Sequence, residues 1–198
     1  VRHGLLAGYL VLLLASPALA QSSLKSRRDY VVGDHPVGVI AADYDGDGFL
    51  DLISVNQQTG GNGDIALIKG FGDGSFRKVS AIVSGSLPSG LVYLDVNNDQ
   101  KMDLVLANLR SQEITTHLGN GTGGFGPKLS TAIVGTPATL AVADYNGDLK
   151  PDVAILNAAQ SNVQVLLGDG LGRFPTSRQT FSVAASSKQI VTADLNAD

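Results

Sequence analysis

The sequence lacks cysteine entirely, and this absence excludes both a disulfide framework and a zinc site with thiolate ligands. It also lacks tryptophan, and aromatic residues make up only 6% of the chain. Basic residues are few and scattered, and the net charge of −4 indicates no positive surface that would attract nucleic acid. What the 198 residues do contain is 43% apolar residues and 24 glycines, a composition typical of a globular protein with a real core and many tight turns.

A hydrophobic run long enough to span a membrane is also missing, but a shorter one lies at the N-terminus. Residues 5–14 are mostly apolar, follow Arg2 and precede Ala18-Leu19-Ala20, which is the pattern of a secretory signal peptide. A membrane anchor is the alternative, yet it requires about 18 to 20 apolar residues. We therefore predict a signal peptide over residues 1–20, a mature chain without a membrane span, and a secreted protein that is extracellular, periplasmic or at the cell surface.

The stretch DYDGDGFLD, residues 43–51, places four aspartates within nine positions. Two carboxylates about 4 Å apart repel by roughly 4 kcal/mol at an effective dielectric constant of about 20. Four converging carboxylates therefore need a cation, or they must separate into water.

The same cluster recurs along the chain. It appears as DVNNDQKMD at 95–103, as DYNGDLKPD at 144–152, and as the beginning of a further copy, DLNAD, at 194–198. The first aspartates of successive copies are 52, 49 and 50 residues apart. A proline before each complete cluster, an asparagine after it and a glycine-rich turn ending in phenylalanine keep the same period. These residues are Pro36, Pro88 and Pro137; Asn56, Asn108 and Asn157; and Phe76, Phe125 and Phe174.

Each period of about 50 residues contains four short runs of strand-forming residues, separated by turns at intervals too short for helices. In the second copy the runs are 90–96, 102–109, 113–119 and 128–134; the first two are continuously apolar, which predicts strands covered on both faces. Four strands per repeat predict an all-β fold, a β-propeller of four-stranded blades and an incomplete ring. The propeller domain is predicted over residues 21–198, with repeats at about 37–88, 89–137 and 138–187 and a partial repeat over 188–198.

The proline, the aspartate cluster and the glycine-rich turn together resemble the FG-GAP repeat, also described as VCBS-type. This repeat occurs in the N-terminal propeller of integrin α-subunits and in many secreted bacterial proteins. The resemblance implies a calcium-binding propeller whose metal loops join the first and second strands of each blade. It also implies a binding or adhesion role, with an extracellular protein or glycan met on the opposite face.

Oxygen ligands at positions 1, 3, 5 and 9 of each cluster, with a main-chain carbonyl at position 7, suit a cation such as Ca2+ that binds about 6 to 8 oxygen atoms. Mg2+ fits less well because it retains its water ligands. The predicted ligands are Asp43, Asp45, Asp47, Phe49 and Asp51 in the first copy, Asp95, Asn97, Asp99, Lys101 and Asp103 in the second, Asp144, Asn146, Asp148, Lys150 and Asp152 in the third, and Asp194, Asn196 and Asp198 in the fourth. The lysines at position 7 are predicted to use only their carbonyls, with their side chains pointing outward.

Two other interpretations of the clusters agree less well with their spacing. An EF-hand needs a glutamate at position 12, where the sequence has Ser54, Leu106 and Ile155. Asx-turns alone need only one or two side chains, so they do not account for the carboxylate at position 9.

The sequence indicates no catalytic constellation. After the signal peptide only His35 and His117 remain, at non-equivalent positions of the repeat, and a lone histidine is more often structural than catalytic. Tyr44 and Tyr145 lie inside the clusters and are predicted to pack between blades. We predict a protein that is not an enzyme; the alternative is one domain of a larger secreted carbohydrate-active or other hydrolytic enzyme whose catalytic part lies beyond residue 198.

Two further expectations concern segments that break the repeat. The first copy carries three extra residues within QQTGGNGD, residues 57–64, which we expect in a loop that contacts a partner; a tolerated surface insertion is the alternative. Residues 24–36 align with the fourth strand of a blade whose other strands are absent. We therefore expect an orphan strand that completes the last blade of a longer propeller, with the present chain ending inside its fourth metal loop.

Overall fold

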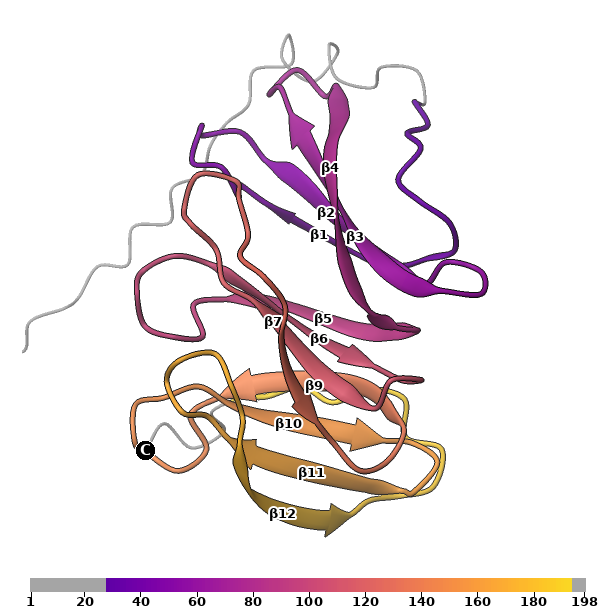
Figure 1. The fold of residues 1–198 in the computed structure, drawn as a ribbon, viewed down its shortest axis with the longest axis vertical. Coiled ribbons are helices and arrows are strands. Elements are labelled where there is room, and N and C mark those ends of the chain that lie inside the picture. The colour runs from indigo at the N-terminus through magenta and orange to yellow at the C-terminus, as the bar shows by residue number, and fades with distance from the viewer. Residues whose placement is uncertain (1–27, 194–198) are drawn as a thin grey trace, which may run out of the picture. The chain divides into compact units, whose positions relative to one another are not determined.

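Residues 28–193 are described by a computed structural model, in which they form strands and connecting loops (Figure 1). The chain divides into residues 1–30 and residues 31–198, and all the described strands belong to the second of these units. The predicted signal peptide and the fourth aspartate cluster, with Asp194, Asn196 and Asp198, lie outside the described residues. The described part of the chain contains no helix that is long and apolar enough to span a membrane.

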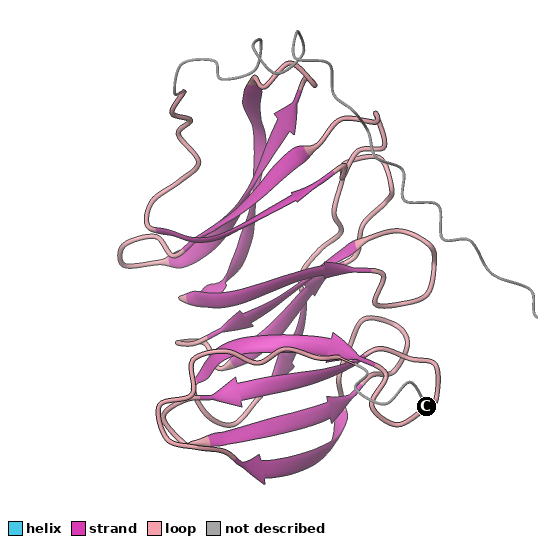
Figure 2. Ribbon diagram, turned by 180° about the vertical axis from the view of Figure 1, so that it is seen from behind, coloured by secondary structure: helices cyan, strands magenta, loops and turns pink. Residues whose placement is uncertain are grey.

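The strands of residues 28–193 form three antiparallel four-stranded sheets, and within each sheet the strands are neighbours in sequence order. Figure 2 shows the same three sheets from behind. This arrangement confirms the predicted all-β fold with one four-stranded blade per repeat. The first sheet contains β1 (Pro36–Ala42), β2 (Asp51–Asn56), β3 (Asn62–Gly70) and β4 (Phe76–Ser86). The second contains β5 (Pro88–Leu94), β6 (Asp103–Asn108), β7 (Glu113–His117) and β8 (Leu129–Ala132), and the third contains β9 (Pro137–Ala143), β10 (Asp152–Asn157), β11 (Asn162–Leu167) and β12 (Thr176–Ser182).

Each blade begins at one of the periodic prolines, Pro36, Pro88 and Pro137. A proline has no N–H to donate, and the first residue of a strand is one of the few positions where a sheet accepts it. The sequence predicts Pro36 in the preceding segment and the other two prolines at the ends of repeats. The structure corrects this by one residue and places each proline in the blade that follows it.

Burial is greatest in the second strand of each blade. All residues of β6 and β10 are buried, as predicted for a strand covered on both faces. The first strand differs from the prediction, because most of β1 is exposed and most of β5 is only half-buried. The third strand β7 is buried instead, although it contains Thr115 and Thr116. A buried polar side chain is tolerated where it is hydrogen-bonded, and the Thr115 hydroxyl accepts such a bond from Asn108 at 3.0 Å.

The hydrophobic core lies between successive sheets rather than inside one sheet. Ile53 and Leu67 of the first blade share one cluster with Leu104 of the second, and a second cluster joins Val105 to Ile155 of the third blade. β5 contacts both β1 and β9. Each inner sheet surface is therefore completed by its neighbour, as expected for units that contact mainly adjacent units.

The two tyrosines in the aspartate clusters have different surroundings. Tyr44 is only 6% exposed and belongs to the core between the first two blades, which confirms its predicted packing. Tyr145, its counterpart in the third blade, is 40% exposed; no described strand follows the third blade, so its packing between blades stays a prediction.

The segment before the first blade, residues 28–35, contains no strand. Its Gly33 nevertheless lies where glycines precede the other blades: a Cβ at Gly33 would collide with the Asn56 side chain. Gly85 and Gly135 have the same relation to Asn108 and Asn157, respectively. That residues 24–36 complete a further blade stays a prediction.

Candidate metal centres

The three complete aspartate clusters form the loops between the first and second strands of the blades. They connect β1 to β2, β5 to β6, and β9 to β10. Their lengths are equal because each cluster spans nine residues and ends on the first residue of a second strand. All three loops therefore lie at the same end of their sheets.

The carboxylate at position 1 organises each loop through backbone N–H groups. Asp43 accepts hydrogen bonds from Gly46 at 2.7 Å and from Gly48 at 2.8 Å, one on each oxygen. Asp144 does the same with Gly147 at 2.8 Å and Leu149 at 2.7 Å. Hydrogen bonds to an ionised carboxylate favour its charged form. Burial opposes this for Asp144, yet the bonds from Leu149 and Gly147 hold the pKa of its carboxyl below the usual value.

The second loop repeats this pattern with different residue types. Asp95 accepts hydrogen bonds from Asp99 at 3.1 Å and from Gln100 at 2.7 Å. Asn97 at position 3 accepts one from Asp99 at 3.2 Å, as Asn146 does from Asp148 at 2.9 Å in the third loop. An amide oxygen thus takes the place that a carboxylate has in the first loop.

The aspartate at position 9 is buried in every loop and joins the loop to the third strand of its own blade. Asp51, Asp103 and Asp152 each have no exposed surface. Each accepts one hydrogen bond from the residue at position 2 and one from the glycine that follows or ends the third strand. The donors are Tyr44 and Gly70 for Asp51, Val96 and Gly119 for Asp103, and Tyr145 and Gly168 for Asp152, at 2.7 to 3.1 Å.

Burial raises the pKa of the Asp103 carboxyl, while the hydrogen bonds from Gly119 and Val96 lower it. The nearby carboxylates of Asp99 and Asp95 raise it further. A cation at this loop would relieve both the burial of the charge and the repulsion between carboxylates.

The first loop brings acidic oxygens close enough for one cation. One carboxylate oxygen from each of Asp43, Asp45 and Asp51 lies within 4.8 Å of the other two. Ligands on opposite sides of a calcium ion at about 2.3 to 2.6 Å are up to about 5 Å apart, so this spacing fits the ion.

A side chain of the protein already places a positive charge at this loop. The ammonium group of Lys69, on β3, contacts the Asp45 carboxylate and lies 2.7 Å from Asp47 Oδ2. The hydrogen bond from Lys69 lowers the pKa of the Asp47 carboxyl. Lys69 is not among the residues predicted from the sequence, although one signal was present: the equivalent positions of the other repeats hold Leu118 and Leu167.

The side chains at position 7 lie in different surroundings in the three loops. Phe49 is 46% exposed, and its ring lies against Gly72. The lysine side chains do not simply point outward, because the Lys101 ammonium lies 3.7 Å from Asp99 and the Lys150 ammonium 3.8 Å from Asp148. The negative carboxylates of each loop attract the ammonium of its position 7 lysine, even though that side chain is half exposed.

The glycine-rich segments are turns, as predicted, and they lie beside the aspartate loops. In the first turn the N–H of Phe71 donates to the carbonyl of Ser75 at 3.1 Å, and equivalent bonds close the other two turns. Gly123 of the second blade approaches Tyr44 and Asp45 of the first loop so closely that a Cβ would crowd them. A turn of one blade thus packs against the aspartate loop of the blade before it.

The two histidines are in different environments. His117 is buried in β7, where its Nδ1 lies 3.2 Å from the carbonyl oxygen of Gly126 and burial lowers the pKa of the imidazole. His35 is exposed just before β1 and lies 3.3 Å from the Thr59 hydroxyl.

Comparison with known protein families finds one described as an FG-GAP-like repeat, which matches residues 43–106, 95–155 and 144–198. Each match begins at the first aspartate of a loop, and the first two end in the second strand of the following blade. Among curated proteins, none matches the chain.

Proposed function

The chain belongs to the FG-GAP-like repeat family, and on this basis we propose that it is a secreted calcium-binding β-propeller protein that acts as a binding or adhesion module. The signal-peptide pattern of residues 1–20 supports secretion. The repeated carboxylate loops support calcium binding. Propellers of this family are typically binding modules, and the proposed function requires no catalytic residue.

The observation that carries the proposal is the repeated geometry of the aspartate loops. In all three loops, the position 1 carboxylate accepts hydrogen bonds from backbone N–H groups, and the position 9 carboxylate is buried at the end of a sheet. Calcium supplies the counter-charge that these groups need. The carboxylates and amides at positions 1, 3, 5 and 9, with the carbonyls of Phe49, Lys101 and Lys150, would hold it.

The proposed role of calcium is structural, and removing it tests the proposal. When free calcium exceeds the dissociation constant about hundredfold, each filled site stabilises the folded state by about 2.7 kcal/mol. For a chain of this size the midpoint of thermal unfolding should therefore rise by about 5 °C or more between excess EDTA and excess calcium. Circular dichroism melts measure this shift.

A matched pair of substitutions in the third blade provides the control. Asp148→Ala removes a proposed ligand, whereas Asp169→Ala removes an aspartate of the adjacent glycine-rich turn that accepts hydrogen bonds from Leu171 and Arg173. Asp148→Ala should reduce the calcium-dependent shift and Asp169→Ala should leave it intact. An unfolding midpoint that is the same in EDTA and calcium contradicts the proposal.

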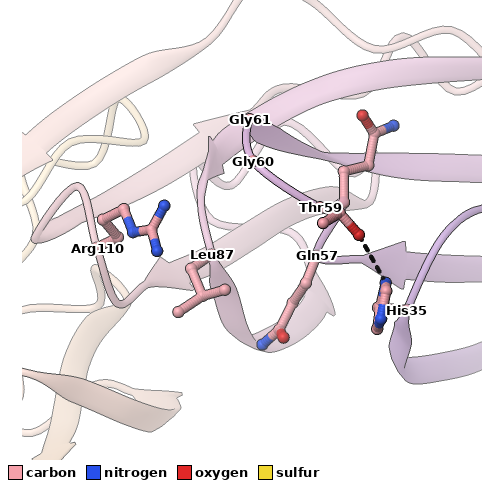
Figure 3. A pocket seen from close by; sticks show the side chains of 8 residues that line it. His35, Gln57, Thr59, Gly60, Gly61, Leu87 and Arg110 are labelled. Carbon is pink, nitrogen blue, oxygen red and sulfur yellow. Dashed lines mark hydrogen bonds between the residues drawn. The ribbon is translucent and has the colours of Figure 1, made fainter.

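For the partner site we propose the opposite end of the sheets, where the β2–β3 loop lines a hollow of about 200 Å3 (Figure 3). Gln57 ties this loop to the second blade, because its side-chain amide donates to the carbonyl of Pro88 at 3.0 Å. Arg110 of the second blade and His35 also line the hollow. Its amide, hydroxyl, imidazole and guanidinium groups suit a polar ligand such as a glycan or a polar protein loop.

Binding of the intact protein to a glycan array and to a panel of immobilised extracellular-matrix proteins tests the partner site. Arg110→Ala should lower the signal on any positive surface at least about fivefold, since a guanidinium in a hollow is a frequent hot spot. Arg173→Ala, at the end of the sheets that carries the aspartate loops, is the control and should retain binding. If the two variants bind equally well, the hollow is not the contact surface.

A further inference from the structure

The first aspartate loop differs from the other two in having a lysine from a neighbouring strand inside it. Lys69 lies one residue before the glycine that ends β3, and its side chain is 26% exposed. Its ammonium reaches Oδ2 of Asp45 and Oδ2 of Asp47. The other oxygen of each carboxylate already accepts a loop N–H, from Asp47 and Phe49, respectively. Lys69 therefore occupies the carboxylate oxygens at positions 3 and 5 that remain for a metal ion.

The lysine is paired with a change at position 3. The first loop has Asp45 together with Lys69, whereas the second has Asn97 with Leu118 and the third has Asn146 with Leu167. An extra carboxylate thus occurs in the one complete repeat that has the extra ammonium. The first loop has four aspartates and Lys69, and the second and third loops have three aspartates each. Without the position 7 residue, each of these three loops therefore carries a net charge of −3.

The lysines at position 7 are not equivalent to Lys69. Lys101 and Lys150 each approach one carboxylate, at 3.7 and 3.8 Å, and their side chains are 46% exposed. An exposed pair at such a distance contributes little, because water screens it. Lys69 contacts two carboxylates, is more enclosed and comes from another strand of the blade.

We propose that Lys69 is a built-in competitor of calcium at the first loop, which holds this loop closed without metal and makes it the weakest calcium site of the three. This inference rests on the proposed calcium binding. Calcium must displace the ammonium from Asp45 and Asp47 before it gains those ligands, so its net gain is smaller than in the second and third loops. The first loop is then formed at low calcium and fills last as calcium rises.

The test is a calcium titration of the 15N-labelled protein, read at backbone amides that belong to single loops. Gly46 and Gly48 report on the first loop, since both donate to Asp43, and Gly147 reports on the third through Asp144. In the unsubstituted protein the amide signals of Gly46 and Gly48 should shift at higher calcium than that of Gly147. In Lys69→Leu they should shift at about tenfold lower calcium than before, a factor that corresponds to about 1.4 kcal/mol.

The same variant should respond in the opposite way without metal. In EDTA, Lys69→Leu loses both ion pairs and leaves four carboxylates uncompensated, so its unfolding midpoint should fall below that of the unsubstituted protein. Lys69→Arg keeps the charge and should keep the weak site. Lys128→Leu, which removes the 3.0 Å ion pair with Glu113 in the second blade, is the control for net charge and should leave the Gly46 titration unchanged.

The double variant Asp45→Asn/Lys69→Leu keeps the inference testable if Lys69→Leu alone does not fold, because it reproduces the pair found in the other blades. Its first loop should titrate together with the third. A calcium response at Gly147 with an unchanged Gly46 midpoint in these variants overturns the role of Lys69 but leaves calcium binding standing. No calcium response at any of the three glycines overturns the proposed function itself.

Discussion

At the scale of single residues, position 6 of the aspartate loops combines a left-handed backbone with one of the hydrogen bonds to the position 1 carboxylate. Gly48, Gln100 and Leu149 all adopt positive φ there, at 88°, 68° and 64°. The N–H of each of these residues donates to the carboxylate of Asp43, Asp95 or Asp144. Glycine adopts this conformation without strain, whereas residues with a Cβ do so at a cost of about 1–2 kcal/mol.

Substituting Gly48 isolates this backbone effect. A Cβ at Gly48 would have no atom within 4 Å, so Gly48→Ala introduces strain without a collision. We expect the free energy of unfolding to fall by about 1 kcal/mol in a urea titration without calcium. Gly61→Ala is the control, because Gly61 also has open space around it but no positive φ. Equal losses for the two variants would contradict the assignment of the effect to the left-handed conformation.

At the scale of strands and loops, much of the fold was predictable because the pattern repeats. The runs predicted at 102–109 and 113–119 contain β6 and β7, and the aspartate clusters join first to second strands as the family resemblance implied. A single copy would have left strand and turn assignments ambiguous. Three copies in register fix both the number of strands in a blade and the positions of the turns.

What the sequence did not reveal depends on contacts between strands. The extra residues of 57–64 were expected in a loop. In the structure β3 already begins at Asn62, which pairs with Ser86 of β4. The loop itself is residues 57–61, only one residue longer than the loop 109–112 of the second blade. A strand absorbs extra residues when its partner strand is long enough to pair with them, and linear spacing does not contain that information.

The same limit applies to Lys69. Its position in the sequence places it on β3, 18 residues after Asp51. Only the pairing of β3 with β2 brings its ammonium to the loop that precedes β2. The aspartates were identifiable because their own spacing carries the chemistry, whereas the lysine acts through the fold.

At the scale of the whole molecule, the surface of the first blade that faces away from the second is apolar and open. Val37 and Val39 of β1 are 48% and 66% exposed, and they line a groove of about 380 Å3 with Leu52 and Ile68. The equivalent of Val39 in the third blade, Leu140, is 5% exposed because the second blade covers it. Repeat symmetry therefore indicates that this surface is shaped to receive a blade.

We expect the 198-residue chain to self-associate through this surface. Val39→Lys should lower the apparent mass measured by light scattering at high protein concentration, since it places a charge in the middle of the apolar groove. Val134→Lys, a change at a valine that is 62% exposed in the loop before β9, is the control and should leave the mass unchanged. Association that persists in Val39→Lys would point to a different contact surface.

A glycine precedes each blade and lies against an asparagine of that blade, and this contact constrains how the sequence of such a protein evolves. Gly33 and Asn56, Gly85 and Asn108, and Gly135 and Asn157 are 22 or 23 residues apart, and each pair spans a boundary between units. A larger residue at either member requires a compensating change in the neighbouring unit. A duplicated unit, by contrast, brings its own asparagine for the segment before it and its own glycine for the blade after it. Gain or loss of entire units therefore preserves every glycine–asparagine contact. A substitution of one member of a pair, in contrast, is tolerated only together with a change in the other member.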